Sequence, residues 1–211
     1  MALALLPLFS GSAQAQTPPH GAEPPVVRVC WDYGCKSHAK VRIPSGTWAQ
    51  VTRLLQSKPE NAAEERRRLR AALTLLDRAI GRLTPVGRDL GGSYPWAGLP
   101  GQQDCIDESL TTESMLRALD QAGLLHWHRV VARARRAPHL FDVHWTAVIE
   151  EAGSGVRYAV DPWYGDQGDP PVIQPLAEWL QGIKPRNLPT HLGRRALAAR
   201  LLRETFGQED F

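Results

Sequence analysis

The chain has 211 residues, of which 43% are hydrophobic, and its formal net charge at neutral pH is +3. This length and composition are typical of one domain with its own core, and no stretch is apolar for long enough to predict a membrane-spanning helix. The small net charge argues against a nucleic-acid-binding protein, because such proteins carry strongly basic surfaces.

The first residues predict export. The run Ala2 to Phe9 is apolar, and Ala13-Gln14-Ala15 has the small-x-small pattern of a signal-peptidase site. We therefore expect residues 1–15 to be a signal peptide and the protein to be periplasmic or secreted; the alternative is an apolar, disordered N-terminus. Residues 16–25 are rich in proline and predict a flexible lead-in, which leaves 26–211 as a single domain.

Three cysteines are present, an odd number for a protein in an oxidising compartment. The segments before Cys30 and after Cys35 are rich in β-branched residues and predict a hairpin. Cys30 and Cys35 lie on either side of its turn and can pair, which leaves Cys105 as a free thiol. A metal site that includes His38 is the alternative, but two cysteines and one histidine do not make up a recognised ligand set.

Two helices are predicted next. Residues 45–57 have the apolar spacing of a short amphipathic helix, and residues 61–83 have that of a longer one whose first half is crowded with charges. We interpret the charge run as a solvated face with intrahelical ion pairs; a surface for an acidic polymer is the alternative. Residues 84–101 are rich in glycine and proline, so we expect an irregular loop that forms one wall of a cleft.

Cys105 lies at the predicted start of a helix between Gly101 and Gly123. Asp104 is a good N-cap residue, and Asp107 can complete a capping box. The unpaired N–H groups and the positive pole of a helix start favour the thiolate, which is the reactive form of cysteine. Cys105 is therefore a candidate nucleophile, and the alternative is a buried structural cysteine.

The chain after this helix predicts short elements. Residues 124–137 predict a strand followed by a basic surface loop. We interpret His126 and His128 as packing or surface residues, because nothing fixes their spacing to another metal ligand. Residues 176–180 predict one helical turn, and residues 194–206 predict a basic helix with one apolar side that docks on the domain.

The chain from 143 to 161 alternates in polarity on either side of a four-residue loop, which predicts a hairpin. In the register that pairs Glu150 with Gly155, His144 lies opposite Asp161. The two side chains then share one face of the sheet, close enough for a carboxylate to hold an imidazole.

A cysteine at a helix start, a histidine on a strand and an aspartate on the next strand are the parts of a thiol acyl-transfer site. Cys105 would attack a carbonyl carbon, His144 would take up and return a proton, and Asp161 would orient the imidazole. We expect the sheet face that carries His144 to meet the helix of Cys105. The other face, which carries Ala147 and Ile149, is predicted to be core.

The oxyanion would be held by the backbone N–H of Cys105 and by a second donor. The candidates for that second donor are Gln102, Gln103 and Trp96. A substrate cleft would be lined by Trp96, Trp163 and Tyr164.

These motifs together resemble the transglutaminase-like superfamily, in particular the bacterial transglutaminase-like cysteine peptidases. The nucleophile motif of that family resembles Asp104-Cys105-Ile106-Asp107 and the helix that follows. Its histidine motif resembles His144-Trp145-Thr146-Ala147-Val148, and its aspartate motif resembles Val160-Asp161-Pro162. The resemblance covers residues 101–164. The chain departs from the family at Glu108-Ser109, where an aromatic residue and alanine are usual.

The resemblance implies an α+β fold of the papain-like, transglutaminase-like type, in which a helix with Cys105 packs on an antiparallel sheet with His144 and Asp161. It implies cleavage or transfer at amide bonds of proteins or peptides through a thioester intermediate, with no cofactor required. Water as the acceptor gives a peptidase and an amine gives a transglutaminase; the resemblance favours the peptidase.

Calcium is allowed by the resemblance, and its carboxylate ligands would come from Asp104, Asp107 and Glu108. Two different functions also stay open. One is that of a non-catalytic exported binding protein of the same fold that holds a peptide or a cell-wall ligand. The second is metal binding, at a site built from Cys105, His144 and Asp161.

Overall fold

The computed structural model describes residues 23–137 and 143–185, and these form an α+β structure with two antiparallel sheets. The predicted signal peptide and the predicted basic C-terminal helix lie outside the described residues. None of the helices in the described part is both long and apolar enough to cross a membrane. In chain order the helices and strands are β1 (Val26–Trp31), β2 (Ser37–Arg42), α1 (Ser45–Leu55), α2 (Ala62–Leu83), α3 (Cys105–Gln121), β3 (His128–Arg136), β4 (His144–Glu151), β5 (Arg157–Asp161), β6 (Val172–Pro175) and α4 (Leu176–Leu180).

The N-terminal part matches the sequence prediction. Strands β1 and β2 pair as a hairpin, and a Cys30–Cys35 disulfide closes its turn. Helix α2 begins after Asn61, whose side chain accepts a hydrogen bond from the Glu64 N–H. The loop between α2 and α3 contains only two short 3-10 turns, at Pro85–Arg88 and Tyr94–Trp96.

The second sheet has the strand order β3-β4-β5-β6, with every neighbouring pair antiparallel. The basic segment that was expected to be a surface loop is the second half of β3. On this edge strand Arg135 is exposed, where a charged side chain is tolerated because it reaches water, whereas Arg136 is buried and donates to the Trp179 carbonyl. Strand β6 was not predicted, because four residues between polar loop residues give too short a pattern.

The predicted pairing of Glu150 with Gly155 is wrong. Glu150 pairs with Arg157, and the Glu151 N–H donates to the Val156 carbonyl at 2.8 Å. The four-residue loop therefore lies one residue later in the chain than predicted, which shifts the pairing register by two residues. Because side chains alternate with a period of two, this shift leaves every residue on its predicted face.

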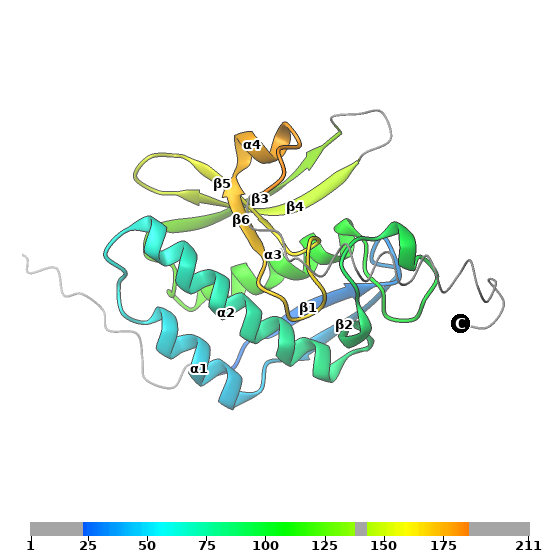
Figure 1. Cartoon of the computed structure of the whole chain (residues 1–211). Helices are drawn as coiled ribbons and strands as arrows, with labels where there is room; N and C mark the ends of the chain where they lie inside the picture. The colour runs from blue at the N-terminus through cyan, green and yellow to red at the C-terminus, as the bar shows by residue number, and fades with distance from the viewer. Residues whose placement is uncertain (1–22, 138–142, 186–211) are drawn as a thin grey trace, which may run out of the picture.

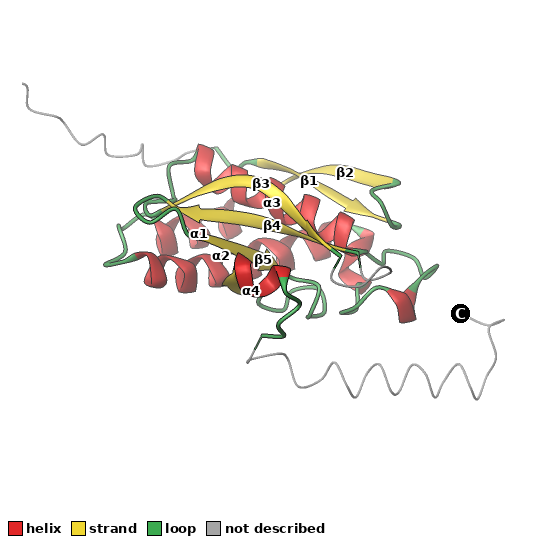
Figure 2. Cartoon of the chain, turned by 90° about the horizontal axis from the view of Figure 1, so that it is seen from above, coloured by secondary structure: helices red, strands yellow, loops and turns green. Residues whose placement is uncertain are grey.

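The two faces of this sheet are covered differently from the prediction. Ala147 and Ile149 belong to the same hydrophobic core as Leu116 and Leu119 of α3, so the cysteine helix packs on the core face. The face of His144 is covered by Trp179 of α4 instead. In Figure 1, α3 and α4 lie on opposite sides of the sheet. Seen from above, the strands lie across the helices and α4 lies beside β5 (Figure 2).

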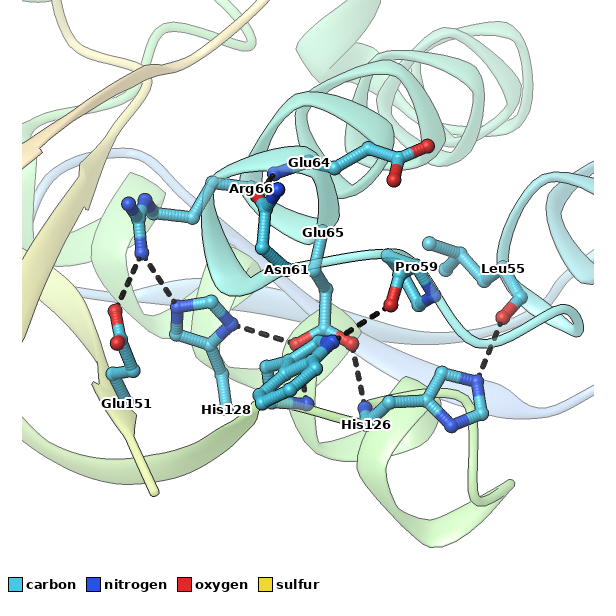
Figure 3. A network of polar contacts seen from close by, with 10 residues as sticks. Leu55, Pro59, Asn61, Glu64, Glu65, Arg66, His126, His128 and Glu151 are labelled. Carbon is cyan, nitrogen blue, oxygen red and sulfur yellow. Dashed lines mark hydrogen bonds and ion pairs between the residues drawn. The ribbon is translucent and has the colours of Figure 1, made fainter. Parts of the chain in front are cut away.

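A buried carboxylate joins α2 to the start of β3 (Figure 3). Glu65 has no exposed surface, and it accepts hydrogen bonds from the backbone N–H groups of His126 and Trp127 and from Nδ1 of His128. Arg66 contacts Nε2 of His128 at 3.1 Å. Because a guanidinium can only donate, Nε2 is the acceptor and Nδ1 carries the proton. Both histidines therefore take part in hydrogen bonds within the fold, His128 with Glu65 and Arg66, and the His126 ring with the Leu55 carbonyl.

Candidate functional site

Cys105 is the first residue of α3, as predicted, and its thiol is free and half-buried. The Asp104 side chain accepts hydrogen bonds from the N–H groups of Ile106 and Asp107, and the Asp107 carboxylate accepts one from the Asp104 N–H. This reciprocal capping box fixes where the helix starts. The N–H of Cys105 is in the first turn, so it has no hydrogen-bond partner within the helix.

His144 and Asp161 meet as predicted. Nε2 of His144 lies 2.8 Å from Oδ2 of Asp161, and both side chains are buried. His144 begins β4 and Asp161 ends β5, so the contact lies at one end of the hairpin. The remaining ring nitrogen, Nδ1, is the one available to Cys105.

The ionisation of His144 is set by opposing effects. Burial lowers the pKa of His144, but the charge and hydrogen bond of Asp161, together with a side-chain hydrogen bond and the charge of Cys105, outweigh it and raise the pKa to about 9. The imidazole is thus held in its protonated form at neutral pH. The Cys105 sulfur also lies 3.9 Å from the Val143 carbonyl oxygen, beside the histidine.

Asp161 is held by three donors. Besides His144, it accepts a hydrogen bond from the Trp179 indole N–H at 2.7 Å and one from the Trp163 backbone N–H at 3.2 Å. Three donors converging on one carboxylate fix its orientation. Trp179 was not among the predicted site residues; its short helical turn was predicted, but nothing in the local sequence connects that turn to Asp161.

Three aromatic rings surround the imidazole of His144. Trp163 lies edge-on with its centroid 4.9 Å away, Trp179 lies tilted at 5.5 Å, and Tyr164 lies at 6.4 Å. Arg136 packs under Trp179, with its guanidinium carbon 4.5 Å from the ring centroid. These rings leave the imidazole little freedom to rotate and keep water away from the hydrogen bond to Asp161.

The side chains predicted as oxyanion donors are used elsewhere. The Gln102 amide donates to the Arg88 carbonyl, and the Gln103 amide donates to the Cys30 carbonyl at 2.7 Å. The Trp96 indole N–H donates to the Gly91 carbonyl at 3.1 Å. These three side chains hold the loop in front of α3. Among the predicted oxyanion donors, the Cys105 N–H is the one that has no hydrogen bond within the described part of the chain.

The acidic residues around Cys105 do not fit a calcium site. Asp104 and Asp107 accept backbone N–H groups of the β1–β2 turn, from Gly34 at 3.0 Å and from Tyr33 at 2.8 Å. These carboxylates are thus already used to bind backbone donors of the turn. Within residues 23–137 and 143–185, no group of three or more histidine, cysteine, aspartate or glutamate side chains is arranged to hold a metal ion.

Glu108 lies behind Cys105 in a buried acidic cluster. Burial, and then the charges of Asp89, Asp161 and Cys105, raise the pKa of Glu108 well above its usual value. Its Oε2 has no hydrogen-bond partner in the described part of the chain. Burial raises the pKa of Asp89 to about 8 and that of Asp77 to about 6. These three side chains line a cavity of about 10 Å³, room for a single water molecule.

Comparison with known proteins adds no relative. No protein-family model matches this chain, and no curated protein or solved structure matches it.

Proposed function

We propose that this protein is an exported thiol-dependent enzyme that acts on amide bonds of proteins or peptides through Cys105, His144 and Asp161. The observation that carries the proposal is the buried 2.8 Å contact between His144 and Asp161, next to a free thiol at a helix start. The disulfide between Cys30 and Cys35 supports export, because such bonds persist in oxidising compartments.

In the proposed reaction the Cys105 thiolate attacks the amide carbon and forms a C–S bond, and the carbonyl oxygen becomes an oxyanion. The N–H of Cys105 stabilises that oxyanion at the positive end of α3. His144 then donates its proton to the amide nitrogen, the C–N bond breaks, and the amine leaves. Asp161 steadies the imidazole throughout.

The thioester is then resolved. Neutral His144 takes a proton from water or from a primary amine, which attacks the thioester carbon. The C–S bond breaks, and a carboxylic acid or a new amide is released. The thiolate and the protonated imidazole are thereby restored. The resemblance to the transglutaminase-like cysteine peptidases, with their papain-like fold, favours water as the acceptor.

Alkylation of Cys105 tests this proposal without a known substrate. A thiolate paired with protonated His144 should react with iodoacetamide at a substantial rate near pH 6.5, where a free thiol with pKa about 8.5 reacts slowly. His144→Ala should lower that rate about ten-fold or more, and Asp161→Asn should lower it less. Circular dichroism of each variant checks that the fold is retained.

A result against catalysis would be equally clear. If Cys105 of the folded wild type reacts like a free thiol and ignores His144→Ala, the enzyme proposal fails. If Cys105 is instead reactive and depends on His144, the protein is incubated with a fluorescent unfolded protein and a fluorescent primary amine. Shorter fragments indicate hydrolysis, and attachment of the amine indicates amide transfer; Cys105→Ala is the control.

A non-catalytic exported binding protein is the second candidate. The observation that favours it is that the Gln102, Gln103 and Trp96 side chains all donate to internal carbonyl groups, so none of these three predicted donors is directed to an oxyanion. Such a protein would hold a peptide or a cell-wall ligand beside Trp163. Binding would then survive Cys105→Ala, with no change in the size of any exported protein added to it.

A further inference from the structure

The turn of the β1–β2 hairpin has an unusual backbone. Four successive residues, Asp32, Tyr33, Gly34 and Cys35, have φ angles of 65°, 65°, 72° and 57°. Only one of them is glycine, so three residues with a Cβ atom are held in the left-handed region, which disfavours them. The Cys30–Cys35 disulfide spans this turn and restricts the conformations that it can adopt.

This conformation directs successive N–H groups to one side, as in the backbone concavities that bind anions. The anions here are the chain's own carboxylates. Tyr33 N–H and Cys35 N–H donate to Asp107, and Gly34 N–H donates to Asp104. The two residues that cap α3 are therefore bound a second time by a turn about 70 residues earlier in the chain, since the sequence separations are 74, 72 and 70.

The position of these carboxylates matters for the thiol. Asp104 directly precedes Cys105, and Asp107 lies two residues after it. Negative charge so close to a thiol disfavours the thiolate. Three N–H groups of the turn donate to the two carboxylates. They offset part of the negative charge and keep the carboxylates on the side of α3 that faces the turn.

A second contact path leads from the turn to the histidine side of the site. The Tyr33 hydroxyl donates to the Ser93 carbonyl, and the Ser93 hydroxyl accepts the Trp163 indole N–H at 2.7 Å. The Trp163 backbone N–H in turn donates to Asp161 at 3.2 Å. The turn thus contacts the helix that carries Cys105 directly, and it is linked through Ser93 to Trp163, which donates to Asp161.

We propose that the disulfide-closed turn of residues 30–35 is a redox-sensitive positioning element that keeps Cys105 reactive. This inference rests on the proposed function, since it concerns the same thiol. In the proposed switch a dithiol reductant transfers two electrons and two protons to the disulfide. The S–S bond breaks, two thiols form, and the reductant becomes a cyclic disulfide. The turn then leaves its left-handed conformation, and its N–H groups withdraw from Asp104 and Asp107.

The test uses the variant Cys30→Ser/Cys35→Ser, in which Cys105 is the one remaining cysteine of the chain's three. At pH 7 its alkylation by iodoacetamide should be about ten-fold slower than in the wild type, as for a shift of one unit in thiol ionisation, and the rate should rise at higher pH. Adding Asp107→Asn to this variant should restore much of the rate, because it removes the charge that the turn no longer offsets. Loosened packing alone would not be rescued by that change.

A second measurement covers the case in which the double variant does not fold. The wild type is treated with dithiothreitol under native conditions, and mass spectrometry follows the alkylation of the peptide that contains Cys105. Reduction should slow this alkylation about ten-fold. If wild-type Cys105 is reactive in a manner that depends on His144, and reduction leaves its rate unchanged, the positioning role is excluded while the proposed function stands. If wild-type Cys105 reacts like a free thiol from the start, the proposed function itself fails.

Discussion

Trp179 donates its indole N–H to Asp161 at 2.7 Å, and both side chains are buried. Helix α4, at the end of the described chain, thereby holds the carboxylate that contacts His144. The same ring covers the imidazole, so one residue provides both a hydrogen bond and the apolar shield of the pair. The His144–Asp161 contact is therefore a property of three elements, β4, β5 and α4, and not of the β4–β5 hairpin alone.

Trp179→Phe keeps an aromatic ring and removes the N–H. A hydrogen bond to a charged group contributes about 1.5–3 kcal/mol, so we expect the free energy of unfolding to fall by about that amount. Urea unfolding followed by circular dichroism measures it. Trp145→Phe, on a half-buried tryptophan of the opposite sheet face, is the control and should cost less. Equal losses in the two variants would mean that the Asp161 hydrogen bond adds no stability.

His144 should make stability depend on pH in a defined direction. Its folded pKa of about 9 lies above the ordinary value of 6.5, so the contribution is fully present below pH 6.5 and is lost as pH rises through about 9. Its size is on the order of 3 kcal/mol, since one pKa unit corresponds to about 1.4 kcal/mol. Comparing urea unfolding of the wild type and His144→Gln between pH 6 and 10 measures it. A difference between the two proteins that grows with pH would contradict the assignment.

Glu65→Gln should be strongly destabilising. The change replaces one carboxylate oxygen with an NH₂ group, which faces at least one of the three N–H donors. A buried donor that loses its acceptor costs about 1–3 kcal/mol, and more where the lost acceptor was charged. Glu64→Gln is the matched control, because Glu64 pairs with Arg68 one turn away in a partly exposed i,i+4 pair, and such pairs contribute little to stability. Thermal and urea unfolding of both variants give the comparison. Similar losses would show that Glu65 does not join α2 to β3 as described.

Glu108→Gln should stabilise the protein at high pH. Because the pKa of Glu108 is raised by burial, the wild type loses stability as pH rises above the usual glutamate value of 4.5, when the unfolded chain ionises more easily than the folded one. The neutral amide has no such penalty, so the variant should gain more over the wild type at pH 8 than at pH 5. Asp120→Asn, at an exposed position of the same helix, should show no such trend. A gain independent of pH would contradict the buried-acid assignment.

Local sequence was sufficient for the features that depend on neighbours along the chain. Asp104 and Asp107 predict the start of α3 because a capping box forms within four residues. Cys30 and Cys35 are five residues apart across a turn, so their pairing follows from proximity. The contact of His144 with Asp161 was predicted although the register was off by two residues, because the period of a strand preserves the face.

Tertiary structure alone decided the contacts between distant segments. Trp179 on Asp161, the turn of Tyr33 on Asp107, and His128 on buried Glu65 join residues separated by 18, 74 and 63 positions. No local periodicity records such contacts, because each depends on how whole elements pack. Glu65 stands within a run of charged residues that is typical of a solvated face, yet it is buried because α2 turns that position toward the start of β3. The sequence by itself determined the helix start at Cys105, the disulfide pairing and the shared face of His144 and Asp161, because these depend on near neighbours in the chain. The packing determined which distant groups contact and cover those side chains.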